Sequence, residues 1–372
     1  MKKKTGKIIL TALLVLIAVL LITGYFVLRN LFTLDPDDNT VTGPDVSVTE
    51  DEEEPVEQLQ ELSGDETLSS VLKSWANLTT DRNLMHSADV ENYLLVGVDV
   101  SGQNSDVMML LSVNKATNKI YLSSVMRDSY TYLDAPGGET FQKMNAAYSF
   151  GGINLLIKTF QDNFKIRIDH YATVNFSTFE TIIDIMGGIN MDVEAYEARE
   201  IDHIIATSYS TAYDPCPYGE NTLLKGIYAL TFCRIRHCYN DADVHRTLNQ
   251  RKFISALIEK SKTVSLSKSG SIITTLLKYV KTDMSSDEIM AVAANAIKDK
   301  WYNYEIVSSC FPDEYDRLDY SGNAWVWIVD YPNAAQKMQQ LIYGTTNISL
   351  KEDRISAIDI MRNAKRTGDA HP

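Results

Sequence analysis

An uncharged apolar run near the N-terminus restricts this chain more than any other feature. Residues Ile8–Leu28 contain no charged side chain, and a helix of that length, rising ~1.5 Å per residue, crosses a bilayer core about 30 Å thick. Four lysines precede the run and Arg29 follows it. This asymmetry predicts one transmembrane helix with a cytoplasmic N-terminus and an extracytoplasmic remainder. A cleaved signal peptide is the alternative, but its apolar region would be shorter and would end in small residues.

Negative charge is concentrated directly after this run. Residues 30–72 hold thirteen acidic residues and no Lys or Arg, in a chain whose formal net charge is −14. Self-repelling charge with few aromatics predicts an extended spacer, with an acidic partner-binding segment as the alternative. The rest of the chain lacks a general basic surface, which argues against nucleic-acid binding. The expected order is a cytoplasmic tip and anchor (1–29), an acidic extracytoplasmic stalk (30–85), a folded domain (86–345) and a polar tail (346–372).

Short apolar runs and helical repeats alternate from Asn92 onward. Such alternation favours an α/β fold, with a sheet covered by helices on both faces. Between 194 and 225 the pattern dissolves, which indicates an irregular insertion or a mobile flap. Strands are expected over 92–99, 107–114, 119–126, 170–176, 189–193, 304–309 and 325–330, and helices over 151–164, 178–186, 243–262 and 286–298.

Four cysteines lie on the predicted outer side, where disulfides can persist. They are Cys216, Cys233, Cys238 and Cys310. Four cysteines allow three complete pairings, and the sequence does not choose among them. Buried free thiols are the alternative.

Two carboxylates lie at the ends of the first two predicted strands. Asp99 stands at the end of the first strand, and Asp106 opens the second. Ligands gather at the carboxyl ends of strands in an open α/β sheet, and paired carboxylates could hold Mg²⁺. Taken alone, the two aspartates are better explained as a turn cap and a strand start.

Basic residues follow at the next strand end and before a predicted helix. Arg127 and Asp128 come directly after the third strand, and Lys143 and Asn145 lead into the helix. An arginine at a strand end points into the same crevice, and a helix start attracts anions through its N–H groups. The simpler alternatives are a surface ion pair and an N-cap.

Two arginine clusters lie about ten residues apart. Arg234 and Arg236 would project to one face of an extended segment, whereas Arg246, Asn249 and Gln250 would share one face of a helix. Guanidinium groups match phosphate in bidentate geometry. With the lysine and the two aspartates, these clusters predict a pyrophosphate site. A solvated basic helix face explains one cluster, but not all of them in this order.

The order of these motifs resembles the LytR–CpsA–Psr family of membrane-anchored cell-wall glycopolymer ligases. The resemblance covers about 90 to 262 and implies an αβα sandwich with a central mixed sheet and a pocket for a polyprenyl-pyrophosphate lipid. The matching segments are NYLLVGVD, NSDVMMLLSVN, SSVMRDSY, KMNAAYSFGG, IDHYATVNFSTFETIIDIMGGINMDV, LLKGIYALTFCRIRH and DADVHRTLNQR.

The resemblance also implies roles for individual residues. Asp99 and Asp106 would hold Mg²⁺ or Mn²⁺, and Asp243 is the candidate base. Arg127 and Arg234 would also be catalytic. The pyrophosphate ligands would be Arg127, Lys143, Arg234, Arg236, Arg246 and Gln250.

The implied reaction moves a phosphoglycosyl polymer from its lipid carrier to a peptidoglycan hydroxyl, usually the C6 hydroxyl of N-acetylmuramic acid. The product is a phosphodiester, and the polymer could be teichoic acid, capsule or another wall glycan. The catalytic domain would face outward, on the single-pass anchor in the cell membrane. The alternatives are a polyprenyl-pyrophosphate hydrolase and a non-catalytic lipid-binding regulator of the cell envelope.

The sequence departs from the family pattern at three places. The family often has an arginine shortly after the first aspartate and another before the Ser-Asp pair, where this chain has Val100-Ser101 and Asn104. Asn249 stands where many members have a basic residue. We therefore expect less positive charge near the metal.

Overall fold

The computed structural model of the chain describes residues 66–99, 103–208, 213–261, 280–321, 325–351 and 354–367. The predicted membrane span, Ile8–Leu28, lies outside these residues. Within the described ranges, every helix is too short or too polar to cross a bilayer.

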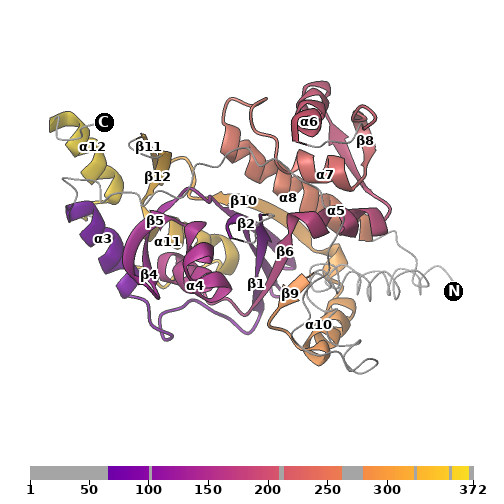
Figure 1. Cartoon of the computed structure of the whole chain (residues 1–372). Coiled ribbons are helices and arrows are strands. Elements are labelled where there is room, and N and C mark those ends of the chain that lie inside the picture. Colours follow the sequence, from indigo (N-terminus) through magenta and orange to yellow (C-terminus); the bar gives the residue numbers. More distant parts are fainter. Residues whose placement is uncertain are drawn as a thin grey trace. The chain divides into compact units, whose positions relative to one another are not determined.

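A six-stranded sheet in the order β10-β3-β2-β1-β6-β9 is the centre of the structure (Figure 1). β2 and β3 pair antiparallel across the turn that ends at the Asn114↔Lys119 pair, as predicted for neighbouring strands. The predicted α/β class with a central mixed sheet is confirmed. The strands are β1 Val90–Val98, β2 Ser105–Asn114, β3 Lys119–Val125, β6 His170–Asn175, β9 Val280–Thr282 and β10 Glu305–Phe311.

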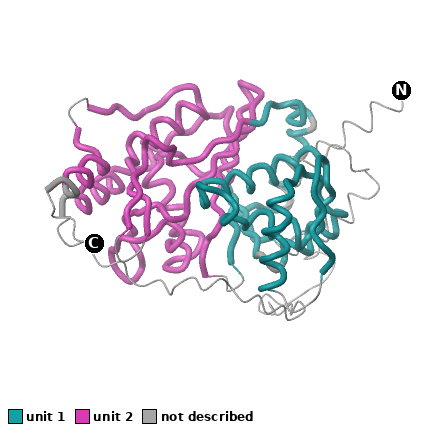
Figure 2. Tube along the Cα trace, turned by 90° about the horizontal axis from the view of Figure 1, so that it is seen from above, with its two compact units in different colours: residues 1–53, 95–102, 170–306 teal, residues 54–94, 103–169, 307–372 magenta. Residues whose placement is uncertain are grey.

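The chain divides into two compact units (Figure 2). Of the described residues, unit 1 comprises 95–99, 170–208, 213–261 and 280–306, and unit 2 comprises 66–94, 103–169, 307–321, 325–351 and 354–367.

Unit 2 has an aromatic core around helix α4. Phe160 and Phe164 on α4 lie 4.9 Å apart between ring centroids, and Phe164 meets Tyr331 of α11 edge to face at 5.9 Å. Helices α4 and α11 both pack against β2. The remaining elements of this unit are α3 Glu66–Asn77, β4 Tyr130–Ala135, β5 Gly138–Lys143, α4 Ala146–Phe164, β11 Arg317–Ser321, β12 Trp325–Val329, α11 Tyr331–Tyr343 and α12 Ala357–Thr367.

Two glycines break α4 near its start. The predicted helix begins at Gly151, whereas the observed one begins at Ala146 and is kinked at Gly151 and Gly152. Gly152 has φ +62°, in the left-handed region where a side chain adds strain. The two glycines therefore kink α4 after its first residues, so that residues 146–150 and 153–164 form separate helical segments.

The predicted stalk, 30–85, is described from Glu66 onward, and this part is folded. The indole N–H of Trp75 on α3 donates to the Asn163 carbonyl at 2.9 Å, and the ammonium of Lys165 donates to the Trp75 carbonyl at 2.7 Å. In the predicted polar tail, α12 packs against α3 and β12.

Unit 1 brings helices close together through a glycine. A Cβ at Gly226, the first residue of α7, would lie 2.4 Å from the Glu180 carbonyl oxygen of α5. Only glycine permits this approach between the two helices. The remaining elements are α5 Phe176–Ile185, β7 Ile189–Val193, α6 Ala195–Ser208, β8 Gly219–Leu224, α7 Gly226–Phe232, α8 Ala242–Ser261, α10 Ser286–Lys298 and a 3₁₀ turn over Trp301–Asn303.

The prediction of an irregular insertion or mobile flap over 194–225 is wrong for the described part. It contains α6, and β8 pairs antiparallel with β7. The apolar positions of α6 are few: Ala198, Ile201 and Ile205 are buried, and the charged residues between them hide the repeat. In β8 only two leucines are apolar, and Leu223 is 46% exposed.

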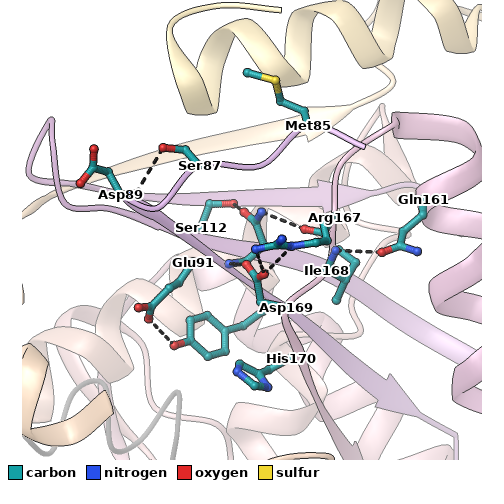
Figure 3. A network of polar contacts seen from close by, with 12 residues as sticks. Met85, Ser87, Asp89, Glu91, Ser112, Gln161, Arg167, Ile168, Asp169 and His170 are labelled. Carbon is teal, nitrogen blue, oxygen red and sulfur yellow. Dashed lines mark hydrogen bonds and ion pairs between the residues drawn. The ribbon is translucent and has the colours of Figure 1, made fainter. Parts of the chain in front are cut away.

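A buried asparagine joins four segments of unit 2. Figure 3 shows three of its partners, Ser112, Arg167 and Asp169. The side chain of Asn92 on β1 accepts the hydroxyl of Ser112 at 2.7 Å and donates to the Arg167 carbonyl at 2.9 Å. It also donates to the Tyr343 hydroxyl at 2.7 Å. The backbone N–H of Asn92 donates to the Asp169 carboxylate at 2.9 Å. Since Asn92 is 0% exposed, these bonds replace all contact with water.

We predict that Asn92→Ala lowers the free energy of unfolding by about 2 kcal/mol or more, because it leaves buried groups without partners. The control is Asn190→Ala, which removes an exposed amide that donates to the Asn221 carbonyl at 3.0 Å. Urea unfolding followed by circular dichroism gives both values. Equal losses in the two variants would contradict the role given to Asn92.

Candidate functional site

A buried charge cluster lies beside the ends of β2, β3 and β5 in unit 2. It consists of Asp106, Arg127, Asp128 and Lys143, and we call it the Arg127 cluster. Arg127 Nη1 lies 2.5 Å from Asp106 Oδ1, and its Nε lies 3.5 Å from Asp128 Oδ2. Lys143 Nζ lies 2.8 Å from the other oxygen of Asp128. The structure therefore brings together the predicted residues Asp106, Arg127 and Lys143.

Backbone hydrogen bonds fix the turn that presents Arg127. The Arg127 carbonyl accepts the N–H of Asn145 at 3.1 Å, and the Asp128 carbonyl accepts the N–H of Trp327 at 2.9 Å. The β4–β5 hairpin pairs Tyr130 with Lys143 and so returns the lysine to the turn.

The simpler interpretations of this region are not supported. Arg127 and Asp128 are 8% and 5% exposed, so they form a buried pair rather than a surface pair. Asn145 precedes α4 but makes no side-chain capping bond in the described part of the chain. Because loss of one partner would leave a buried charge uncompensated, the cluster is sensitive to any single substitution. The side chain of Lys143, at 33% exposed, forms its solvent edge.

A second cluster lies on the buried face of α8 in unit 1. Arg246 Nη2 is 2.5 Å from Asp243 Oδ1, and the two residues are 7% and 8% exposed. Asp243 is in the first turn of α8, where the helix dipole favours negative charge. We call Asp243, Arg246, Asn249 and Gln250 the α8 cluster.

The loop between α7 and α8, residues 233–241, carries the other two arginines and lies against this cluster. The Gln250 amide donates to the Cys233 carbonyl at 3.3 Å. Arg234 and Arg236 are half-buried, and Ile235 between them is 0% exposed. The segment is a turn-rich loop rather than a strand, but the burial still alternates. Unit 1 thus places the loop that carries Arg234 and Arg236 against the helix that carries Arg246.

The two candidate metal ligands belong to different units. Asp99 follows β1 in unit 1, is 8% exposed, and accepts the Asn175 amide through its carbonyl at 3.4 Å. Asp106 is part of the Arg127 cluster in unit 2. The described residues include no group of three or more side chains suited to a metal. Mg²⁺ often takes one or two carboxylates and completes its shell with water and phosphate oxygens, so the donor chemistry fits.

Three residues in or beside these clusters were missed from the sequence as functional positions. Asp128 joins Arg127 to Lys143, and only its place beside Arg127 pointed to it. Tyr239 contacts Asn249 of the α8 cluster, and Glu197 contacts Tyr239; no sequence signal separated these two from ordinary surface residues. Asn104, which stands where the family often has an arginine, accepts a hydrogen bond from the Ser149 hydroxyl of α4 at 2.8 Å.

Residues 47–342 match the model of the LytR_cpsA_psr family. The chain belongs to this family. The match spans most of the chain and includes the described residues of both clusters, as the resemblance of the motifs predicted.

Curated relatives in the LytR_cpsA_psr family carry a transferase name. Two are called polyisoprenyl-teichoic acid–peptidoglycan teichoic acid transferase TagU. The one from Bacillus cereus is 29% identical over 220 residues, covering 58% of this chain and 67% of its own. The one from Oceanobacillus iheyensis is 32% identical over 222 residues, covering 57% and 64%. The chain thus spans about two thirds of the length of these relatives.

Solved structures share the fold. Bacillus subtilis TagT superposes with a TM-score of 0.55 at 20% identity, over 71% of this chain and 95% of its own. A protein of Streptococcus agalactiae gives a TM-score of 0.59 at 22% identity, over 73% and 94%.

No disulfide joins Cys216, Cys233, Cys238 or Cys310 in the structure. Cys216 and Cys233 are buried, as the buried-thiol alternative expected, whereas Cys238 and Cys310 are partly exposed. Burial raises the pKa of the Cys216 thiol to about 12, and burial also raises the pKa of Cys233.

We predict that Cys216 and Cys233 resist iodoacetamide at pH 8 in the folded chain, because a buried thiol with a raised pKa forms little thiolate. All four cysteines should react after unfolding without reductant. Peptide mass spectrometry measures both states. A cysteine that reacts only after reduction would contradict the free-thiol assignment.

Proposed function

We propose that this chain transfers a glycopolymer from a polyprenyl-pyrophosphate carrier to a peptidoglycan hydroxyl. The product is a phosphodiester, and polyprenyl phosphate leaves. The names of the curated relatives support a transferase role and favour teichoic acid as the polymer, with capsule as another possible substrate class.

The observation that carries this proposal is the buried Asp243–Arg246 pair beside a loop with two more arginines. An aspartate in that position can take the proton from an acceptor hydroxyl, which typically contributes about 10²–10⁴-fold to the rate. Arg246 compensates the charge of the buried carboxylate. Arg234, Arg236 and Gln250 are the proposed ligands of the pyrophosphate in this unit.

The Arg127 cluster is the proposed second group of ligands. In phosphoryl transfer, catalysis consists mainly of positioning and charge stabilisation. Arg127 and Lys143 would neutralise charge on the phosphate oxygens. We propose Asp99 and Asp106 as ligands of Mg²⁺ or Mn²⁺, which when bound would polarise a phosphoryl oxygen. The lipid pyrophosphate supplies the activation, so the reaction requires no nucleotide.

The apolar run Ile8–Leu28 is the proposed single-pass anchor, with the N-terminus in the cytoplasm and the catalytic domain outside. An anchor would hold the domain beside the lipid donor in the bilayer. The acidic segment after it would let the domain reach the wall.

We predict that Asp243→Asn lowers turnover by about 10²–10⁴-fold while lipid binding persists. The assay uses the full chain in detergent with a short-chain prenyl-pyrophosphoryl glycan, a peptidoglycan oligomer and Mg²⁺. The matched control is Asp241→Asn, since Asp241 is 53% exposed and lies two residues away. Full activity of Asp243→Asn would contradict the assignment of the base.

Product analysis in the same assay separates the alternatives. Glycan attached to peptidoglycan through a phosphodiester supports the ligase. Glycan phosphate released into water would indicate a hydrolase. Lipid binding without turnover would indicate a regulator.

We predict that chelation abolishes turnover and that Asp99→Asn and Asp106→Asn each raise the Mg²⁺ concentration for half-maximal activity. About tenfold is expected, because each variant removes one of two protein carboxylates. Mg²⁺ titrations of the full chain measure this value. An unchanged requirement in both variants would contradict the proposed metal ligands.

A further inference from the structure

A hydrogen-bond triad extends from the α8 cluster through Asn249. It consists of Glu197 on α6 and Asn249 on α8, which are buried, and Tyr239 in the 233–241 loop, which is half-buried. The Tyr239 hydroxyl donates to Glu197 Oε1 at 2.5 Å and accepts the Asn249 amide at 2.9 Å. A phenol has one hydrogen to donate, and Glu197 receives it.

Each partner of Tyr239 is itself fixed. Glu197, 3% exposed, accepts the Glu194 N–H at 2.8 Å through its second oxygen and so closes the first turn of α6. Asn249 is 0% exposed and also donates to the Phe232 carbonyl at the end of α7, at 3.5 Å. Helix α6 packs against α7 in the same unit (Figure 1). The hydroxyl is therefore tied to helices that cannot shift independently.

The triad fixes the C-terminal part of the 233–241 loop, which carries Arg234 and Arg236. At the near end, Gln250 donates to the Cys233 carbonyl at 3.3 Å. At the far end, the Tyr239 ring stacks on His245 of α8 at 3.6 Å between centroids and 12° between planes. The Tyr239 N–H bonds back to the Arg236 carbonyl at 3.3 Å. Both arginines lie between these two attachments.

We propose that Tyr239, through Glu197 and Asn249, is a positioning residue that sets the place of Arg234 and Arg236 relative to α8. The proposal deepens, and rests on, the proposed pyrophosphate-binding function. It also gives the segment 194–225 a role, since the carboxylate of α6 fixes a loop of the site rather than touching substrate itself.

The test compares Tyr239→Phe with wild type in the full chain in detergent. Affinity for geranyl pyrophosphate with Mg²⁺ is measured by calorimetry well below the melting temperature. We expect about a tenfold loss, since a hydrogen bond to a charged group contributes roughly that much to an equilibrium. Tyr228→Phe is the matched control, because its exposed hydroxyl bonds the Asp214 carbonyl at 2.7 Å outside the site.

A double-variant comparison separates positioning from general stability. If Tyr239 acts through the arginines, its substitution should have little further effect on affinity in the Arg234→Ala/Arg236→Ala background. A merely structural role would lower the melting temperature and leave affinity unchanged. Unchanged affinity, or an equal loss in both backgrounds, would overturn the proposal.

Hydrogen exchange across 233–241 supplies a readout without ligand. We expect faster exchange in Tyr239→Phe and in Glu197→Ala, and no change in Tyr228→Phe. If wild type fails to bind geranyl pyrophosphate, the proposed function fails, and exchange then decides whether Tyr239 fixes the loop. Unaltered exchange in Tyr239→Phe would overturn the positioning role by itself.

Discussion

The ion pair between Asp243 and Arg246 is the constraint on which the proposed chemistry depends. Both residues are more than nine-tenths buried, and a buried charge is tolerated only where it is compensated. The pairing requires positions three residues apart on one face of α8. The same face presents Asn249 and Gln250 to the 233–241 loop, so one helix carries the candidate base, its buried partner and the groups that contact this loop.

Unit 2 also compensates buried charges, but with residues from separate segments. There the charges come from separate segments: Asp106 from β2, Arg127 and Asp128 from a turn, and Lys143 from the end of a hairpin. Two cations and two carboxylates compensate one another at the ends of strands. In the same unit, Asn92 joins four segments through buried hydrogen bonds. Ligand binding at such a cluster exchanges one set of charge contacts for another.

The spacing of apolar residues and glycines along the chain predicted several strands and helices and where they end. Continuous apolar runs revealed β1 and β2, and Gly187–Gly188 marked the end of α5. Helical spacing placed Arg246, Asn249 and Gln250 on one face. Burial was not predictable: Arg127–Asp128 read equally well as a surface pair. Helix α6 was missed because its buried residues are separated by charged ones, and Tyr239 was missed because its partners lie 42 and ten residues away.

The central claim is that the α8 cluster and the 233–241 loop of unit 1 bind a diphosphate. Calorimetric titration of the full chain with geranyl pyrophosphate and Mg²⁺ tests this most directly. We expect affinity to be strongly reduced by Arg234→Ala and by Arg246→Ala, and to be unchanged by Tyr228→Phe, whose hydroxyl bonds the Asp214 carbonyl outside the site. Unchanged affinity in both arginine variants would contradict the account.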